Sequence, residues 1–180
     1  MATIYLAGGC FWGVQRYMAL VRGVTGTEVG YANGTTGSAT YRDVCTGRTG
    51  YAETVCVDYD PTVAPLAFLL DLFYRAIDPT SLNRQGNDRG TQYRTGIYYT
   101  DPDDRPIIEH SLAQLQARYK SAIVVEVKPL ECYARAEDYH QDYLDANPGG
   151  YCHINRDLFE LAAKAVPDLT WISPFRAGPQ

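Results

Sequence analysis

The chain has 180 residues, of which 46% are hydrophobic and 21% are charged, a composition typical of a globular protein with one ordinary core. The chain has 16 Lys and Arg residues and 21 Asp and Glu residues, which gives a formal net charge of −5. This charge argues against binding of nucleic acid through a basic face. The N-terminus has no secretory pattern and no apolar stretch is long enough to span a bilayer, so we expect a cytoplasmic protein without a membrane partner, whose thiols stay reduced.

Strand and helix patterns alternate along the chain. Strands are expected in the alternating or β-branched segments 3–7, 24–31, 53–59, 95–99 and 122–127. Helices are expected in the segments 10–21, 65–77, 105–119, 134–146 and 157–166. The polar, Gly-containing segment 80–93 is expected to be a long loop of the kind that often carries function. This interleaving predicts an α/β (α+β) fold, a single domain with a mixed sheet flanked by helices.

Cys10 lies where the first strand should turn into the first helix, directly after Gly8 and Gly9. The free N–H groups of a helix N-terminus favour a thiolate, so Cys10 is a candidate nucleophile. The alternative is a small buried core residue, because free cysteines are often buried. No two cysteines form a C-x-x-C pair, which excludes a thioredoxin-type active site and the common zinc spacings. The cysteines are Cys10, Cys45, Cys56, Cys132 and Cys152.

The string Gly-Cys-Phe-Trp-Gly at 9–13 strengthens the first reading of Cys10, because the chain resembles the A-type peptide methionine sulfoxide reductases (the MsrA family) there. Further blocks match that family in order. They are Gly-Tyr-Ala at 30–32, Tyr-Arg-Asp-Val-Cys at 41–45, Gly-Tyr-Ala-Glu at 50–53, Asp-Pro-Thr at 78–80, Gln-Gly-Asn-Asp-Arg-Gly-Thr-Gln-Tyr-Arg at 85–94 and Ala-Glu-Asp-Tyr-His-Gln at 136–141. The resemblance implies a ferredoxin-like two-layer core. It also implies a reductase domain over 1–152, with 153–180 as a C-terminal extension of the same domain.

The resemblance assigns roles in the reduction of methionine sulfoxide. It makes Cys10 the nucleophile that attacks the sulfur. It makes Glu53 the acid that protonates the oxygen, for which burial must raise the pKa of the carboxyl. It makes Tyr41 and Tyr93 the phenols that hydrogen-bond the oxygen, and Asp88 a carboxylate that organises the site.

The same resemblance implies the substrate pocket. Phe11 and Trp12 would hold the methyl group, since sulfur-bearing groups make favourable contacts with aromatic rings. Tyr143 would stand near the site, and His140 would either brace the region or take a direct part. The implied substrate is the S epimer of methionine sulfoxide, free or in oxidised proteins. No metal or cofactor is implied.

After oxygen transfer Cys10 would be a sulfenic acid, which a second thiol converts to a disulfide. The family's resolving position corresponds to Cys152, after the turn at 147–150. The chain has no later cysteine, so either thioredoxin reduces the Cys10–Cys152 disulfide directly or Cys132 acts as a substitute. We expect Cys45 to be a core thiol, Cys56 to be buried, and the protein to be a monomer.

Two other functions use the same residues. A cysteine hydrolase or transferase would pair Cys10 with His140 as its base, but it has no use for a resolving thiol at Cys152. A redox sensor or methionine-binding module would not need Glu53 and the two tyrosines together with both thiols.

Overall fold

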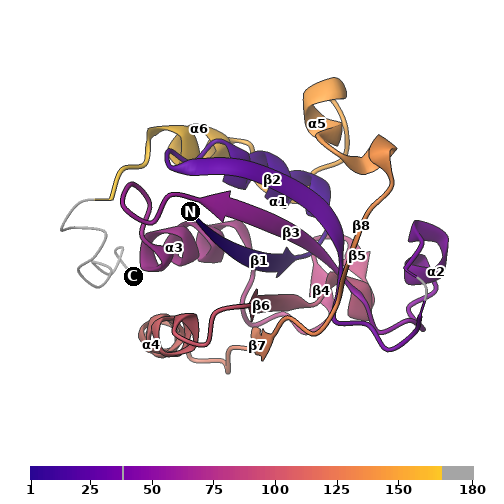
Figure 1. Cartoon of the computed structure of the whole chain (residues 1–180), viewed down its shortest axis with the longest axis horizontal. Coiled ribbons are helices and arrows are strands. Elements are labelled where there is room, and N and C mark those ends of the chain that lie inside the picture. The colour runs from indigo at the N-terminus through magenta and orange to yellow at the C-terminus, as the bar shows by residue number, and fades with distance from the viewer. Residues whose placement is uncertain (38, 168–180) are drawn as a thin grey trace.

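The computed structural model describes residues 1–37 and 39–167, and it contains one six-stranded sheet (Figure 1). Its strands, from one edge to the other, are β7 (Glu126–Pro129), β6 (Thr95–Tyr99), β1 (Ala2–Gly8), β3 (Ala52–Tyr59), β2 (Val24–Ala32) and β8 (Tyr133–Arg135). The pair β6 and β7 is parallel, and the other neighbouring pairs are antiparallel. The sheet is therefore mixed, as predicted.

The four central strands have the ferredoxin-like order. Helix α1 (Phe11–Ala19) connects β1 to β2, and β3 lies between these two parallel strands. Helix α3 (Leu66–Ala76) connects β3 to β6 in the same way, with β1 between them. Two interlocked split βαβ units of this kind define the ferredoxin-like core. The predicted fold class is confirmed.

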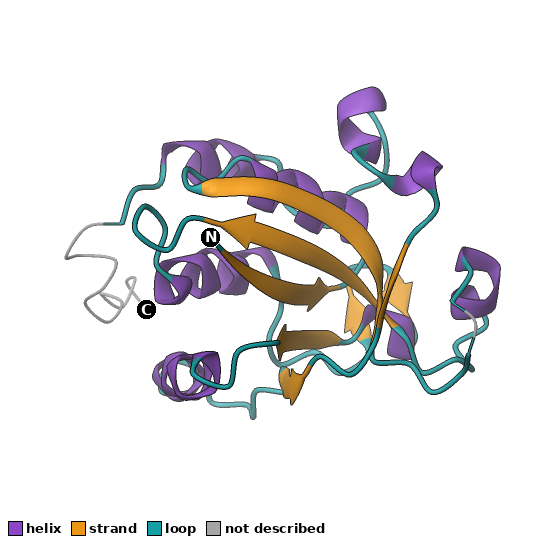
Figure 2. Cartoon of the chain, in the orientation of Figure 1, coloured by secondary structure: helices purple, strands orange, loops and turns teal. Residues whose placement is uncertain are grey.

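The helices cover one face of the sheet. Helix α1 contacts β2 and β3, α3 contacts β1, and α6 (Asp157–Lys164) contacts both α1 and α3; Figure 2 shows these three helices grouped together. Because side chains alternate along a strand, Glu53, Val55 and Val57 of β3 face these helices. Cys56 faces the other side, where it is half-buried rather than fully buried as expected.

The segment after Cys152 packs on the same core as the rest of the chain. Ile154 is 3% exposed and Ala162 of α6 is 0% exposed, and both belong to the main apolar cluster. The predicted division into 1–152 and an extension 153–180 stays a prediction, and its last residues, 168–180, lie outside the described part of the chain.

The predicted helix over 134–146 is wrong in its first half. Tyr133–Arg135 forms the edge strand β8, which pairs with Gly30, Tyr31 and Ala32 of β2. A short 3₁₀ helix (Asp138–His140) follows, and only Tyr143–Ala146 forms an α-helix, α5. The free edge of β2 offers backbone hydrogen bonds that outweigh the local helix pattern.

The predicted strand over 122–127 lies further along the chain. The N–H of Ile123 donates to the side chain of Gln116 (2.9 Å) and that of Val124 to the carbonyl of Pro79 (2.8 Å), so these residues are bound before β7 begins at Glu126. Helix α4, expected over 105–119, spans Asp104–Gln116.

Three small structures were not predicted from the sequence. Tyr41–Cys45 forms a short helix, α2, capped by Thr40, whose Oγ1 accepts from the N–H of Asp43 (3.2 Å). The predicted loop 80–93 contains a hairpin of β4 (Arg84–Gln85) and β5 (Asp88–Arg89), then a 3₁₀ helix (Thr91–Tyr93).

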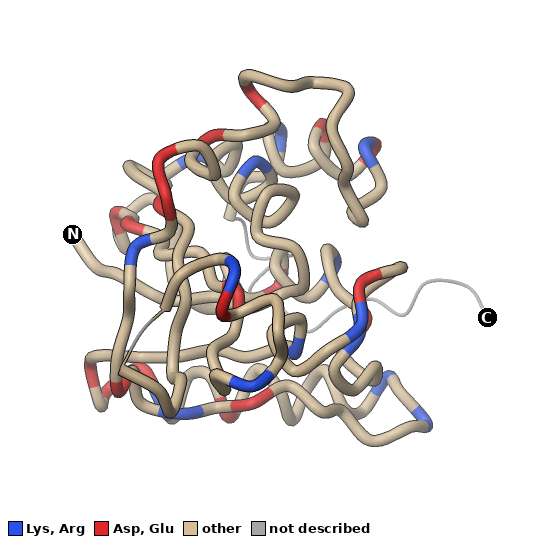
Figure 3. The backbone as a smooth tube through the Cα atoms, turned by 90° about the vertical axis from the view of Figure 1, so that its right-hand side faces the viewer, with Lys and Arg blue, Asp and Glu red and all other residues tan. Residues whose placement is uncertain are grey.

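Charges of both signs are interspersed along the backbone in Figure 3.

Within residues 1–37 and 39–167, none of the helices combines the length and the apolar character that crossing a membrane requires.

Candidate active site

Cys10 occupies the junction between β1 and α1, as predicted. It is the N-cap residue of α1 and is 7% exposed. The chain reaches it through Gly9, whose φ of +86° lies in the left-handed region. A Cβ on Gly9 would come within 2.6 Å of Gln85 in β4, so this glycine lets the hairpin pack directly against the turn.

The carboxyl of Glu53 lies next to this turn. It is 2% exposed, and its Oε2 accepts a hydrogen bond from the N–H of Phe11, the residue after Cys10 (3.1 Å). Burial raises the pKa of Glu53 to about 8. The hydrogen bond from the N–H of Phe11 lowers this pKa, and the negative charge of Asp88 raises it further, but burial has the largest effect. Near neutral pH this carboxyl therefore carries a proton in most molecules.

The thiol of Cys10 is also shifted. Burial raises its pKa far above the ordinary value, the carboxyl of Glu53 adds to the rise, and the backbone N–H of Trp12 opposes it. The role of Cys10 as nucleophile stays a prediction. The N–H group acts in the predicted direction, but loss of hydration outweighs it.

Aromatic rings surround the turn. Phe11 is 1% exposed, and its ring centroid is 5.7 Å from that of Tyr31 and 5.3 Å from that of His140. Trp12 stacks on Tyr143, with centroids 3.8 Å apart and planes inclined by 16°. The four predicted pocket residues, Phe11, Trp12, His140 and Tyr143, therefore form one contiguous cluster.

His140 stands at the centre of this cluster. Its Nδ1 accepts from the indole N–H of Trp12 (3.1 Å), and its ring centroid is 4.5 Å from that of Tyr41. Burial lowers the pKa of His140, with Glu137 opposing, so the ring is neutral at physiological pH. Its Nε2 is buried without a hydrogen-bond partner among the described residues.

The two predicted tyrosines come from α2 and from the 3₁₀ helix Thr91–Tyr93. Burial and a hydrogen bond with Cys45 raise the pKa of Tyr41, and burial and the charge of Glu53 raise that of Tyr93. The 3₁₀ helix that ends at Tyr93 contacts β3, the strand that carries Glu53, and the ring of Tyr41 packs against that of His140 in the aromatic cluster. Both tyrosines keep their protons and can donate hydrogen bonds to an oxygen.

The segment that contains Cys152 lies across the same region. A Cβ on Gly13, in the first turn of α1, would come within 2.8 Å of the Sγ of Cys152. Tyr151 donates a hydrogen bond to the Oδ2 of Asp88 (2.8 Å). Cys152 is half-buried, and Cys10 and Cys152 are both free thiols.

Of the two remaining thiols, Cys45 differs from the expectation. Cys45, expected in the core, is exposed, because the short helix α2 buries only Val44 against the rest of the protein. Cys132 is half-buried, and its Sγ lies 3.7 Å from the carbonyl of Gly34.

Two residues of this region were missed in the sequence. Glu137 accepts from the N–H of Tyr41 (3.1 Å) and from the hydroxyl of Tyr31 (2.9 Å), so it fixes the start of α2. Tyr151 binds Asp88, as described above. The signals were their positions, within the block 136–141 and directly before Cys152.

Within residues 1–37 and 39–167, His, Cys, Asp and Glu side chains form no group of three or more that could hold a metal ion. The chemistry that this arrangement offers is that of a thiol, a protonated carboxyl and two phenols in a dry, aromatic setting.

Comparisons with known proteins identify the family of the chain. The sequence model of the family described as "Peptide methionine sulfoxide reductase" matches residues 2–167, further than the motifs alone reach. A relative from Lachnoclostridium phytofermentans, described as peptide methionine sulfoxide reductase MsrA, is 55% identical over 163 residues, which are 91% of this chain and 98% of that protein. The solved structure of Mxr1 from Saccharomyces cerevisiae in reduced form has a TM-score of 0.81 at 37% identity, over 85% of this chain and 90% of that chain. Mxr1 in complex with Trx2 has a TM-score of 0.56 at 25% identity, over 78% of this chain and 83% of that chain.

Proposed function

The chain belongs to the peptide methionine sulfoxide reductase family and is an oxidoreductase that reduces methionine sulfoxide, and we propose that it does so with Cys10 as nucleophile and Glu53 as acid. The observation that carries the proposal is the buried carboxyl of Glu53, bound to the N–H that follows Cys10. A protonated acid beside a nucleophilic thiol is the pair that sulfoxide cleavage requires.

The first step transfers oxygen from the substrate to Cys10. The sulfur of Cys10 attacks the sulfoxide sulfur, and the oxygen takes a proton from Glu53 while Tyr41 and Tyr93 hydrogen-bond to it. The hydroxyl oxygen then passes from the substrate sulfur to the sulfur of Cys10, the substrate S–O bond and the new S–S bond both break, and methionine leaves while Cys10 remains as a sulfenic acid. The thiol proton of Cys10 restores the acid form of Glu53. Phe11 and Trp12 contact the methyl group of the substrate, and the carboxylate of Asp88 organises the site.

The second step regenerates Cys10. The thiol of Cys152 attacks the sulfenic sulfur, the Cys10–Cys152 disulfide forms, and water leaves with the hydroxyl oxygen and one proton from each side. Thioredoxin then reduces the disulfide to two thiols by exchange. The solved complex of the related Mxr1 with Trx2 supports this choice of reductant. The position of Cys152 over the first turn of α1 supports its role as the resolving thiol.

The substrate is the S epimer, free or within oxidised proteins. We expect reductase activity with thioredoxin on methionine-(S)-sulfoxide and on a peptide that contains it, and none on the R epimer. The measurement is methionine released from each resolved epimer, followed by chromatography. Consumption of the R epimer alone would contradict the assigned stereochemistry. A cytoplasmic location and a monomeric state stay predictions.

Glu53→Gln tests the acid. Glutamine keeps an acceptor for the N–H of Phe11 but has no proton to give, so we expect the single-turnover rate at pH 7 to fall by about 10²- to 10⁴-fold with the fold retained. Because the pKa of Glu53 is about 8, its acid form is present below pH 8 and is lost above it. The ratio of the wild-type rate to the variant rate should therefore be constant below pH 8 and shrink at higher pH. A ratio of one at pH 7 would remove Glu53 from the acid role.

A further inference from the structure

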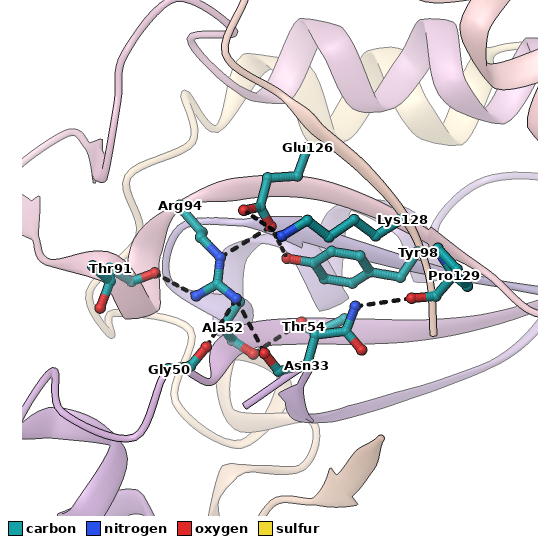
Figure 4. Close-up of polar contacts among 10 residues, drawn as sticks. All are labelled: Asn33, Gly50, Ala52, Thr54, Thr91, Arg94, Tyr98, Glu126, Lys128 and Pro129. Atoms are coloured by element: carbon teal, nitrogen blue, oxygen red, sulfur yellow. Dashed lines mark hydrogen bonds and ion pairs between the residues drawn. The ribbon is translucent and has the colours of Figure 1, made fainter. Parts of the chain in front are cut away.

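Arg94 uses its whole guanidinium group to connect segments that are far apart in the sequence (Figure 4). Its Nη1 donates to the carbonyl of Thr91 (2.9 Å) and its Nη2 to the carbonyl of Gly50 (2.9 Å). The Nη2 also lies 3.5 Å from the carbonyl of Asn33, at the end of β2. Two of the three guanidinium nitrogens are thus committed to backbone carbonyls.

The third nitrogen pairs with an acid. The Nε of Arg94 lies 3.1 Å from the Oε2 of Glu126 in the edge strand β7, and the hydroxyl of Tyr98 donates to the same oxygen (3.0 Å). Burial alone would raise the pKa of Glu126, but Arg94, Tyr98 and Lys128 lower it on balance, so this carboxylate stays charged. The side chain of Arg94 is 13% exposed, which makes this pair far less hydrated than an ordinary surface ion pair.

The two carbonyls have one feature in common, namely that each precedes a residue proposed to act on the sulfoxide oxygen. Gly50 stands three positions before Glu53 and leads directly into β3. Thr91 begins the 3₁₀ helix that ends at Tyr93, and Tyr93 is the residue before Arg94. The guanidinium plane therefore fixes the entry of β3 relative to this 3₁₀ helix.

From this geometry we propose that Arg94 is a positioning residue for the reaction, which sets the separation of Glu53 and Tyr93 through its bonds to the carbonyls of Gly50 and Thr91. The inference rests on the proposed roles of Glu53 and Tyr93. The contact that matters is the fork of two N–H donors, since both carbonyls are neutral. Lysine has one ammonium group and cannot span both carbonyls and Glu126 from one plane.

The test compares Arg94→Lys with Glu126→Gln in two reactions. The first is single-turnover reduction of methionine-(S)-sulfoxide, which uses Glu53 and Tyr93. The second is formation of the Cys10–Cys152 disulfide after an excess of hydrogen peroxide oxidises Cys10, a reaction that requires no hydrogen bonds to a sulfoxide oxygen. Arg105→Lys is the matched control, because Arg105 forms another Arg–Glu pair, with Glu109 on α4, and is exposed.

We expect Arg94→Lys to lower the single-turnover rate at saturating sulfoxide by about 10²-fold and to leave the sulfoxide concentration that gives half of this rate nearly unchanged. A loss of this size is typical when a catalytic group is displaced by about an ångström. Peroxide-driven disulfide formation should stay within about twofold of the wild type. Glu126→Gln leaves both carbonyl bonds in place and should cost less than about threefold, as should Arg105→Lys.

Three results would overturn the inference. The first is a wild-type sulfoxide rate in Arg94→Lys. The second is an equal loss of rate in both reactions of Arg94→Lys, which would mark a purely structural residue, and the third is a loss in Glu126→Gln as large as that in Arg94→Lys. Failure of the wild type itself to reduce the sulfoxide, with intact disulfide formation, would instead overturn the proposed function.

Discussion

Cys10→Ser is expected to abolish reduction of methionine sulfoxide, with a loss of at least about 10³-fold in single-turnover rate, as for other enzymes that lose their nucleophile. A serine hydroxyl ionises far less readily than a thiol and cannot form a sulfenic acid. The remaining site, with Glu53, Tyr41 and Tyr93, can bind the substrate but has no atom to accept its oxygen.

The measurement is methionine released in a rapid mixing experiment, with unfolding followed in parallel. Cys56→Ser is the matched control. Cys56 is half-buried on the face of the sheet opposite Glu53, and its replacement should leave the rate within about twofold. Normal turnover in Cys10→Ser would contradict the assignment of Cys10 as the nucleophile.

Cys152→Ser is expected to release about one methionine per protein molecule and then to stop, because the first step needs only one thiol. No disulfide can then form with Cys10, so thioredoxin finds nothing to exchange with and steady-state turnover falls to background. The wild type should instead consume thioredoxin in proportion to the sulfoxide reduced.

Cys132→Ser provides the comparison that names the resolving thiol. Cys132 is held near the carbonyl of Gly34, whereas the Sγ of Cys152 lies over Gly13, one helical turn from Cys10. Mass-spectrometric mapping after one turnover should find the Cys10–Cys152 disulfide in Cys132→Ser. Sustained thioredoxin-driven turnover in Cys152→Ser, lost on further removal of Cys132, would assign resolution to Cys132 instead.

Strong periodic patterns predicted the central sheet and its long helices well. β1, β3 and α3 lie within a residue or two of their expected bounds, because each pattern matches the face that is actually buried. The segment 134–146 failed for the opposite reason. Its first residues form a strand because they pair with the edge of β2, which is distant in the sequence. A pattern of neighbouring residues carries no information about such a partner.

The site shows a similar division. The motif strings indicated which residues to expect, and the structure brings Cys10, Glu53, Tyr41, Tyr93 and Cys152 into one region. The raised pKa of Glu53 agrees with the expectation from the resemblance, whereas the raised pKa of Cys10 does not follow from its position in the sequence. The N-terminus of α1 favours a thiolate at Cys10, but burial, which no local sequence pattern reveals, raises its pKa instead.

The same burial has a consequence for durability. Peroxide and other oxidants attack exposed thiolates, and repeated attack carries a cysteine to sulfinic and sulfonic acids that thiols do not reverse. Cys10 is 7% exposed, so oxidants in solution should reach it slowly, and only an excess of peroxide should oxidise it. Burial of Cys10 should therefore slow its conversion to these acids under the oxidising conditions that produce methionine sulfoxide.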